Sequence, residues 1–180
     1  MECLAGIPGS VGGCVRMNAG GAFGDIGQVT ERVKVMNTRG EVFYRERDDL
    51  AFGYRSSNLA APFVLEVELR LLPDDLKAIE KRMKTIWMAK KNSQPMSAPT
   101  AGCVFKNPRG LSAGLLIEQA GLKGASVGGA VVSRKHANFI VVRDKERTTA
   151  ADILALIEQI RTAVKERFDV YLELEIEVWP

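Results

Sequence analysis

A glycine-rich segment at the start of the chain is the first stretch whose residues suggest binding chemistry. Residues 1–21 hold six glycines, at positions 6, 9, 12, 13, 20 and 21. Glycine loses more backbone entropy on folding than other residues, so such a cluster needs a structural or functional reason. The spacing fits neither the GxGxxG dinucleotide motif nor the GxxxxGK[ST] phosphate loop. Two interpretations stay open: a tight-turn loop, or backbone N–H groups that bind a pyrophosphate.

Two further segments combine side chains that can bind anions or donate protons. The first, Gly53-Tyr54-Arg55-Ser56, places a guanidinium in a predicted loop, where it either holds an anion or is an ordinary surface arginine. The second spans 101–108 and reads AGCVFKNP, with Cys103 as either a reactive thiol or a small buried apolar residue. His136 is the single histidine, and a Cys–His pair is a weak hypothesis because the spacing does not support it.

The C-terminal segment alternates apolar and acidic residues, which predicts a strand over 170–179. Leu172, Leu174, Ile176 and Val178 share one face, and Glu173, Glu175 and Glu177 share the other. A row of glutamates on one face is by default a solvated surface. The alternation does not single out one glutamate for chemistry.

Composition and charge exclude several classes of protein. The chain has 180 residues, 46% of them hydrophobic and 26% charged, with a net charge of +3. This charge and the absence of a basic block argue against nucleic acid, and no apolar run is long enough for a membrane helix. Three cysteines without CxxC spacing predict neither a disulfide framework nor a zinc site. We expect a cytoplasmic protein with no nucleic-acid, membrane or metal partner.

The first half of the chain reads mainly as β-structure. Segments 31–37 and 41–46 predict a hairpin whose turn uses Gly40, and 47–50 predicts a helical turn. From 63 to 71, Phe63, Leu65, Val67, Leu69 and Leu71 alternate with more polar residues, which predicts a half-buried strand that ends before Pro73.

The second half contains the longer helices. Asp74 is the expected cap of a helix that runs to about residue 93, and the best boundary between two parts lies near 73–95. A short helix is predicted over 112–120, with strands over 125–132 and 137–142. Thr149 and Asp152 resemble a capping box before a helix that reaches Phe168. Strands and helices in mixed order indicate an α+β fold.

Together these motifs resemble the UDP-N-acetylenolpyruvoylglucosamine reductase (UDP-N-acetylmuramate dehydrogenase) family. The motifs are GIPGSVGG-x-VRMNAG, FGYRSS, AG-x-VFKNP, VGGA-x-VS-x-KHANFIV and L-E-x-E-I, in this order along the whole chain. The direct passage from FKNP to the helix at Ser112 is similar to the short subtype, which lacks an inserted substrate-covering segment. The resemblance implies a flavoenzyme of bacterial peptidoglycan precursor synthesis.

The family's reaction implies roles for three residues of this chain. NADPH reduces bound FAD, hydride passes to C3 of UDP-N-acetylglucosamine enolpyruvate, and C2 receives a proton, which gives UDP-N-acetylmuramate. By resemblance, Arg55 stabilises the enolate, Cys103 stands where the family has its serine proton donor, and Glu175 is the family's C-terminal glutamate. Leu174 replaces the usual proline before it. A thiol with a pKa near ~8.5 is protonated at neutral pH, so Cys103 can act as the acid.

The resemblance also implies two sets of binding residues and no metal. The expected FAD contacts are Gly6, Ile7, Pro8, Gly9, Ser10, Gly12, Gly13, Asn18, Ala19 and Gly20. The expected substrate contacts are Tyr54, Lys106, Asn107 and His136, although a structural hydrogen-bonding role for His136 is an equal alternative.

The implied organisation is a partial FAD-binding domain of the vanillyl-alcohol-oxidase (PCMH-like) type over 1–73, then an α+β substrate-binding domain over 74–180. Family members carry a further segment before the glycine loop that supplies much of the FAD contact. We therefore expect this chain to be the C-terminal portion of the enzyme. One alternative is a non-catalytic fragment that binds the UDP-sugar and needs an N-terminal FAD-binding piece. A related FAD-linked oxidase is disfavoured by the FKNP and KHANFIV motifs.

Overall fold

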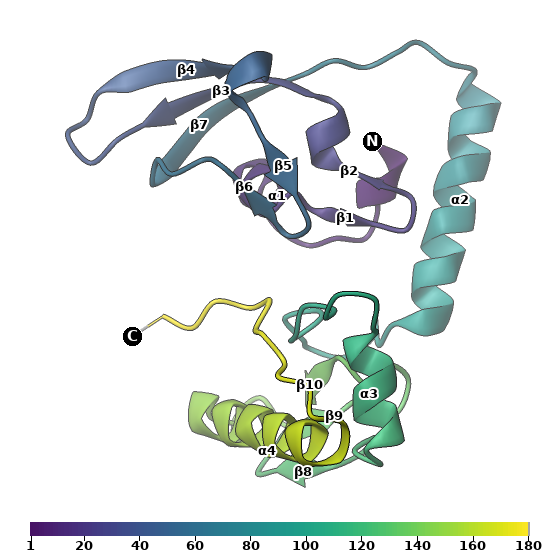
Figure 1. Ribbon diagram of the computed structural model, residues 1–180. Helices are drawn as coiled ribbons and strands as arrows, with labels where there is room; N and C mark the ends of the chain where they lie inside the picture. The colour runs from purple at the N-terminus through teal and green to yellow at the C-terminus, as the bar shows by residue number, and fades with distance from the viewer. Residues whose placement is uncertain (180) are drawn as a thin grey trace. The chain divides into compact units, whose positions relative to one another are not determined.

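The fold is α+β and was obtained as a computed structural model, which describes residues 1–179 (Figure 1). The chain divides into two compact units, Met1–Lys90 and the part from Lys91 onward, each described below by itself. The division lies within the 73–95 stretch in which the sequence places a boundary, but it follows Lys90 and not residue 73. The assignment of the two parts to flavin and substrate binding stays a prediction.

The first unit contains a three-stranded antiparallel sheet with the order β4–β3–β7 (Figure 1). Its strands are β3 (Thr30–Met36), β4 (Val42–Glu46) and β7 (Phe63–Leu69). The β3–β4 hairpin confirms the predicted one, and Gly40 adopts a φ of 81° in its turn, where a side chain would be strained. The predicted helical turn is also present, as the 3₁₀ turn Arg47–Asp49.

The predicted side-chain alternation along β7 is wrong in its first half. Val35 pairs with Val64 and Lys34 with Glu66, so the register skips Leu65 in a β-bulge. A bulge shifts the following side chains to the other face of the strand. Val64 and Val67 therefore both pack against the core, whereas Phe63 and Leu65 are each 50% exposed.

Short elements and one long helix complete the first unit. The short ones are Glu2–Leu4 (3₁₀), α1 (Val11–Arg16), β1 (Gly20–Gly21), β2 (Gly24–Asp25), Ile26–Gln28 (3₁₀), β5 (Phe52–Gly53) and β6 (Ser56–Ser57). The buried core consists of Val15, Ile26, Val33, Val35, Leu50 and Leu59. Lys90 on the long helix α2 (Leu76–Ser93) donates to the carbonyls of Cys3 and Ala5, which fastens this helix to the start of the chain.

Asp75, rather than the predicted Asp74, caps helix α2. A carboxylate oxygen of Asp75 accepts from the N–H of Ala78 at 2.9 Å, the contact expected of a residue immediately before a helix. Asp74 instead accepts a hydrogen bond from the guanidinium of Arg82 at 2.7 Å. Adjacent acidic residues make this one-residue error easy, because either side chain suits a helix start.

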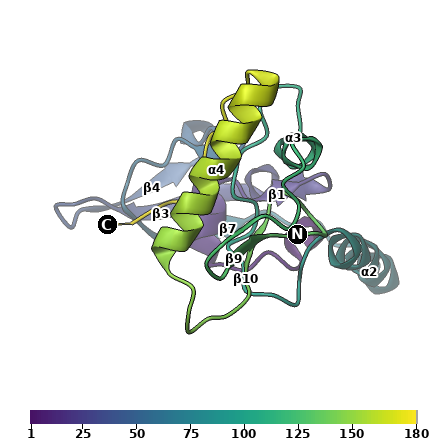
Figure 2. The same ribbon diagram turned by 90° about the horizontal axis from the view of Figure 1, so that it is seen from below.

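The second unit packs two helices on a three-stranded antiparallel sheet with the order β10–β9–β8. The strands are β8 (Ser126–Val127), β9 (Ala130–Val132) and β10 (Ile140–Val142), and the helices are α3 (Ala113–Gln119) and α4 (Ala150–Phe168). Helix α4 contacts β8, β9 and α3, and both views place it beside β9 (Figures 1 and 2). The core includes Ile117, Val132, Leu156, Ile160 and Val164. The predicted caps are confirmed, Ser112 for α3 and the Thr149–Asp152 capping box for α4.

Two predicted strands of this unit differ from the structure. Segment 125–132 is two strands joined at Gly128 and Gly129, and a Cβ at Gly129 would lie 2.0 Å from Oγ1 of Thr148. The predicted strand over 170–179 is wrong: in the part of it that the structure describes, pairing is limited to an isolated bridge between Leu174 and Phe105. Leu172 is fully buried and Leu174 and Ile176 pack against the core, but Val178 is 54% exposed, so the apolar face is used only as far as Ile176.

Candidate active site

In the second unit, hydrogen bonds bring three segments together: residues 103–106, 136–140 and 173–175. Cys103 forms a β-bridge with Phe139, and the N–H of Val104 donates to the carbonyl of Asn138 at 2.9 Å. On the other side, the N–H of Glu175 donates to the carbonyl of Val104 at 2.8 Å. Cys103 and Glu175, both predicted catalytic residues, therefore lie on neighbouring segments.

Cys103 lies at the border of the buried core. Val104 and Phe105, which follow it, are 3% and 1% exposed, while Cys103 itself is half-buried. Gly102 before it has a φ of 92°, and its N–H donates to Oγ1 of Thr100. This hydroxyl in turn donates to the carbonyl of Ile140 at 2.7 Å. The thiol is thus held between a fixed turn and a buried segment.

Burial separates the three glutamates that the sequence pattern leaves equivalent. Glu173 and Glu177 are exposed, whereas Glu175 is half-buried. The carboxylate of Glu173 also accepts a hydrogen bond from the ammonium of Lys106. Burial thus distinguishes Glu175 from the other two glutamates, and its catalytic role stays a prediction.

His136 is half-buried, and burial lowers the pKa of its imidazole. Its Nδ1 accepts from the N–H of Asn138 at 3.3 Å, and its ring makes an edge contact with Phe139 at a centroid distance of 4.7 Å. Because Nδ1 is an acceptor, the ring proton of the neutral form belongs on Nε2. His136 therefore presents a neutral N–H donor at neutral pH.

We expect the lowered pKa of His136 to make the free energy of unfolding depend on pH. The unfolded chain, in which the histidine keeps its ordinary pKa of 6.5, takes up the proton before the folded chain does. This contribution to stability is complete above that pH and is lost as the pH falls below it. Urea unfolding at pH 7 and pH 5 should show a smaller difference in His136→Gln than in wild type; equal differences would contradict the assignment.

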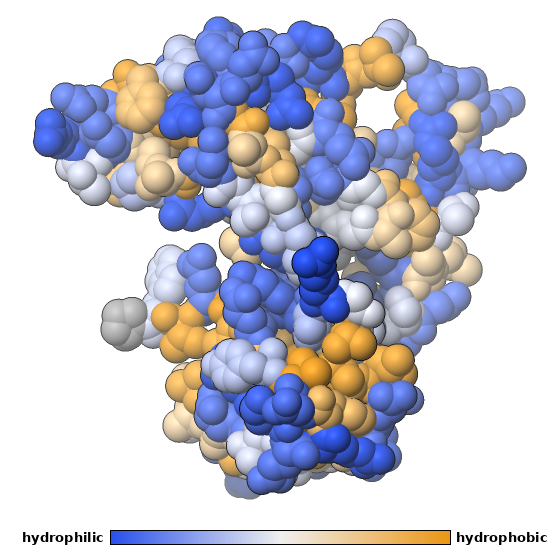
Figure 3. All heavy atoms as spheres, in the orientation of Figure 1, coloured by the Kyte–Doolittle hydropathy of each residue, from blue (hydrophilic) through white to orange (hydrophobic). Residues whose placement is uncertain are grey.

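The remaining predicted substrate contacts of this unit also have structural partners. Asn107 accepts, through its side-chain oxygen, from the N–H of Ala113 at 3.0 Å, next to the start of α3. Apolar surface gathers over α3, where Leu111 and Leu115 are about half exposed (Figure 3). Substrate roles for Lys106 and Asn107 stay predictions.

In the first unit, the glycine segment is partly a packing device and partly exposed backbone. A Cβ at Gly12 would lie 3.2 Å from Cβ of Val64, so this glycine lets α1 approach β7. Gly9 differs: it is exposed, has a φ of 147°, and a Cβ there would have nothing within 4 Å. Ser10 caps α1 by accepting from the N–H of Gly13 at 3.2 Å. Residues 8–10 are all exposed, and a pyrophosphate contact there stays a prediction.

Asn18 links the glycine segment to the loop that carries Arg55. Its side chain is 7% exposed, donates to the carbonyl of Gly53 at 3.0 Å and accepts from the N–H of Gly27 at 3.0 Å. Gly53 begins the turn between β5 and β6, in which Arg55 adopts a φ of 51° and stacks its guanidinium 5.2 Å from the centre of the Tyr54 ring. Asn18 thus positions this turn, and its contact with a cofactor stays a prediction.

The chain is similar in sequence to known reductases. Residues 94–179 match the family model of the UDP-N-acetylenolpyruvoylglucosamine reductase C-terminal domain. The reductases of Moorella thermoacetica and Geobacillus kaustophilus are 46% and 43% identical to the chain, each over 99% of this chain and 59% of the relative. These matches relate the chain to the UDP-N-acetylenolpyruvoylglucosamine reductases. The resemblance seen in the sequence is confirmed.

A solved structure agrees with these matches. The reductase from Thermus caldophilus superposes with a TM-score of 0.86 at 42% identity, over 99% of this chain and 64% of that protein. The chain thus spans about three fifths of the length of the curated relatives it matches. These findings show the fold and the similarity to the reductases, whereas the activity of the complete relatives is a proposal for this chain.

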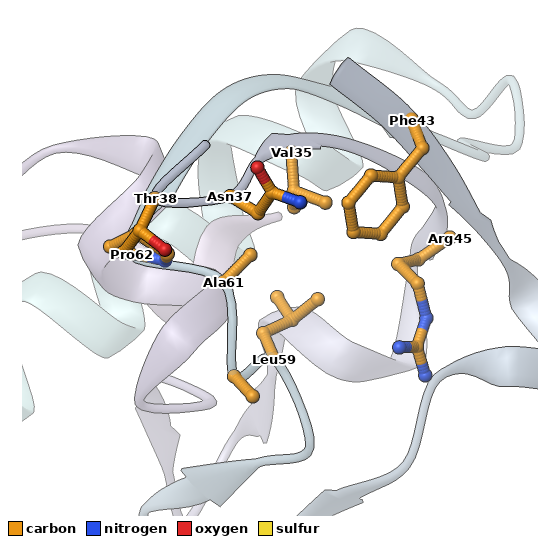
Figure 4. Close-up of a pocket in the computed structure, with 9 residues that line it drawn as sticks. Val35, Asn37, Thr38, Phe43, Arg45, Leu59, Ala61 and Pro62 are labelled. Carbon is orange, nitrogen blue, oxygen red and sulfur yellow. The ribbon is translucent and has the colours of Figure 1, made fainter. Parts of the chain in front are cut away.

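Two pockets in the described residues contain none of the predicted site residues. One, of about 330 Å³, lies between the β3–β4 hairpin and residues 59–62, with Phe43 and Leu59 facing into it (Figure 4). The other, of about 430 Å³, lies between residues 95–99 and strands β9 and β10. Within residues 1–179, the structure shows no group of His, Cys, Asp and Glu suited to a metal and no helix able to cross a membrane.

Sequence reasoning missed Asn138, which is 3% exposed and binds the backbone of Phe105 with both ends of its amide. The signal in the sequence was one amide side chain, Asn138, among the apolar residues Ala137, Phe139 and Ile140. A polar residue in such a run is usually hydrogen-bonded where it is buried.

Proposed function

We propose that this chain provides the substrate-binding domain and part of the FAD-binding domain of a cytoplasmic, NADPH-dependent UDP-N-acetylenolpyruvoylglucosamine reductase. The reaction converts UDP-N-acetylglucosamine enolpyruvate to UDP-N-acetylmuramate for peptidoglycan synthesis. The carrying observation is that Cys103 and Glu175, chosen by resemblance, lie on hydrogen-bonded neighbouring segments. Relatives that are 46% and 43% identical carry the name of this enzyme, which supports the proposal.

Three side chains are assigned to the chemistry. Reduction of the enol ether at C3 leaves negative charge at C2 and on the adjoining carboxylate, so a cation and an acid are both needed. The guanidinium of Arg55 would stabilise this charge, and the Cys103 thiol would protonate C2. The half-buried carboxylate of Glu175 would orient or polarise the same part of the substrate.

The residues present fit a flavin in part. The exposed backbone at Pro8, Gly9 and Ser10 would approach the pyrophosphate of FAD, with Gly6, Ile7, Gly13 and Ala19 close to it in the sequence. When bound, FAD would supply the hydride that it receives from NADPH. Gly12 and Gly20 would contribute through tight packing, since a Cβ at Gly20 would lie 2.3 Å from the carbonyl oxygen of Gly24.

The substrate would be held by groups that match its charges and hydroxyls. Lys106 provides an ammonium for the diphosphate or carboxylate, and its present pairing with Glu173 keeps it near the surface. Neutral His136 offers an N–H donor, and Tyr54, 54% exposed, offers a ring and a hydroxyl. Asn107 would contribute its amide N–H₂ while its oxygen stays on Ala113.

The glutamates provide a matched test of the site. We expect Glu175→Gln to lower turnover by about tenfold or more, because it removes a half-buried charge from the segment that is hydrogen-bonded to the Cys103 segment. Glu177→Gln should stay close to wild type, because this carboxylate is exposed. Steady-state kinetics of both variants decide the matter, and similar losses in the two would remove Glu175 from the site.

Flavin content tests the proposal directly. The purified chain should be yellow, with a flavin absorbance band at about 450 nm. A UDP-sugar should stabilise it against heat. A colourless protein that a UDP-sugar still stabilises would support the alternative, a non-catalytic binding fragment that requires an additional FAD-binding part. A protein that responds to neither ligand would contradict both.

A further inference from the structure

The backbone that carries Cys103 is held by one buried side chain. The Oδ1 of Asn138 accepts from the N–H of Phe105 at 3.0 Å, and its Nδ2 donates to the carbonyl of Phe105 at 2.8 Å. In this way the amide pairs with Phe105 as a neighbouring strand would. The side chain is 3% exposed, so water does not readily replace these bonds.

The main chain of Asn138 contacts both functional neighbours as well. Its carbonyl accepts from the N–H of Val104 at 2.9 Å, and its N–H donates to Nδ1 of His136 at 3.3 Å. One residue therefore fixes the segment after Cys103 and also the ring proton of His136. On the other side of Cys103, the N–H of Gly102 donates to Oγ1 of Thr100 at 3.3 Å, so the backbone is held both before and after the cysteine.

We infer that Asn138 is a positioning residue that fixes the Cys103 thiol and the His136 imidazole relative to one another. The inference rests on the proposed role of Cys103 as proton donor, but its tests do not need turnover. Loss of the amide would leave the N–H and carbonyl of Phe105 unsatisfied in the core. The segment would then open locally more often, and the thiol would become more accessible.

Thiol alkylation measures this effect. In a Cys3→Ser, Cys14→Ser background, Cys103 is the one cysteine left of the three in the sequence. We expect Asn138→Leu, which keeps the volume but loses the amide, to react with iodoacetamide about tenfold faster than the background protein. Asn138→Asp keeps an acceptor for the N–H of Phe105 and should give an intermediate rate.

Val164→Ala is the matched control. Val164 is fully buried on α4 in the same core, and its side chain forms no hydrogen bond with the Cys103 segment. The substitution should therefore lower the free energy of unfolding without removing a contact of that segment. Its alkylation rate should stay within about twofold of the background. Equal rates in Asn138→Leu and Val164→Ala, at similar losses of unfolding free energy, would overturn the inference.

Hydrogen exchange on the unmodified protein keeps the inference testable if Asn138→Leu does not fold. The N–H of Phe105 should exchange as slowly as those of Val104 and Lys106, although its acceptor is a side chain. Fast exchange at Phe105 alone would overturn the inference. The positioning role would be retained if Phe105 exchanges slowly in the unmodified protein and Asn138→Leu is alkylated fast. If, at the same time, no preparation reduces the enol ether, the proposed function would be rejected.

Discussion

Cys103→Ala should lose reduction of the enol ether by about 10²- to 10⁴-fold while reduction of the flavin by NADPH continues, because only the first of these steps needs the proton donor. Cys103→Ser should keep a substantial part of the activity, since a hydroxyl can take the same position. Stopped-flow absorbance of the flavin separates the two half-reactions. The assay applies to the chain itself, or to a chimera in which the Moorella thermoacetica relative supplies the part that the chain does not match.

Cys14→Ser serves as the control for this experiment. Cys14 lies on α1 and packs against the core of the first unit, where burial raises the pKa of its thiol and makes it a weaker acid. It should retain both half-reactions. If Cys103→Ala slowed both half-reactions equally, the thiol would have a structural role, and the proton would have to come from another group.

The sequence predicts elements well where their signals are local. The capping box of Thr149 and Asp152 satisfies backbone groups within one turn, so it identifies the start of α4 without knowledge of the rest of the fold. The β3–β4 hairpin is similarly local, because its turn and both strands lie within 17 residues, from Thr30 to Glu46. Such elements need no distant partner to be recognised.

The predictions that failed depend on distant partners. Alternation over 170–179 describes a strand, but a strand needs a neighbour, and the structure supplies one only near Leu174. The bulge at Leu65 is set by how β7 meets β3, which residues 63–71 do not reveal by themselves. Apolar alternation thus indicates which residues suit a sheet, but not where pairing stops.

The same distinction applies to the site. Resemblance names Cys103 and Glu175 because long motifs surround them, and the structure adds that they are neighbours. The sequence does not reveal that the amides of Asn18 and Asn138 position the backbone, because their partners lie up to 35 residues away in the sequence. Side chains that act on backbone carry no spacing signature, and only the folded chain shows what they hold.

Phe105→Ala should cause one of the largest losses of stability in the chain, of about 3–5 kcal/mol in the free energy of unfolding. Phe105 is 1% exposed and belongs to the core that α3, α4 and the sheet of the second unit share. Removal of the ring leaves a cavity and also reduces the apolar surface that is buried on folding. A typical domain has only about 5–15 kcal/mol of stability, so this variant is expected to be marginally folded.

The matched comparison is Phe63→Ala, the same substitution at a side chain that is 50% exposed on β7. This variant should lose less than about 1 kcal/mol, because half of the ring already contacts water and no cavity forms. Urea unfolding with the slope fitted freely measures both, and equal losses would show that Phe105 is not the core residue described above. A large loss confined to Phe105→Ala would also link the core to the site, because the ring that fills the core belongs to the residue whose backbone is paired with Asn138.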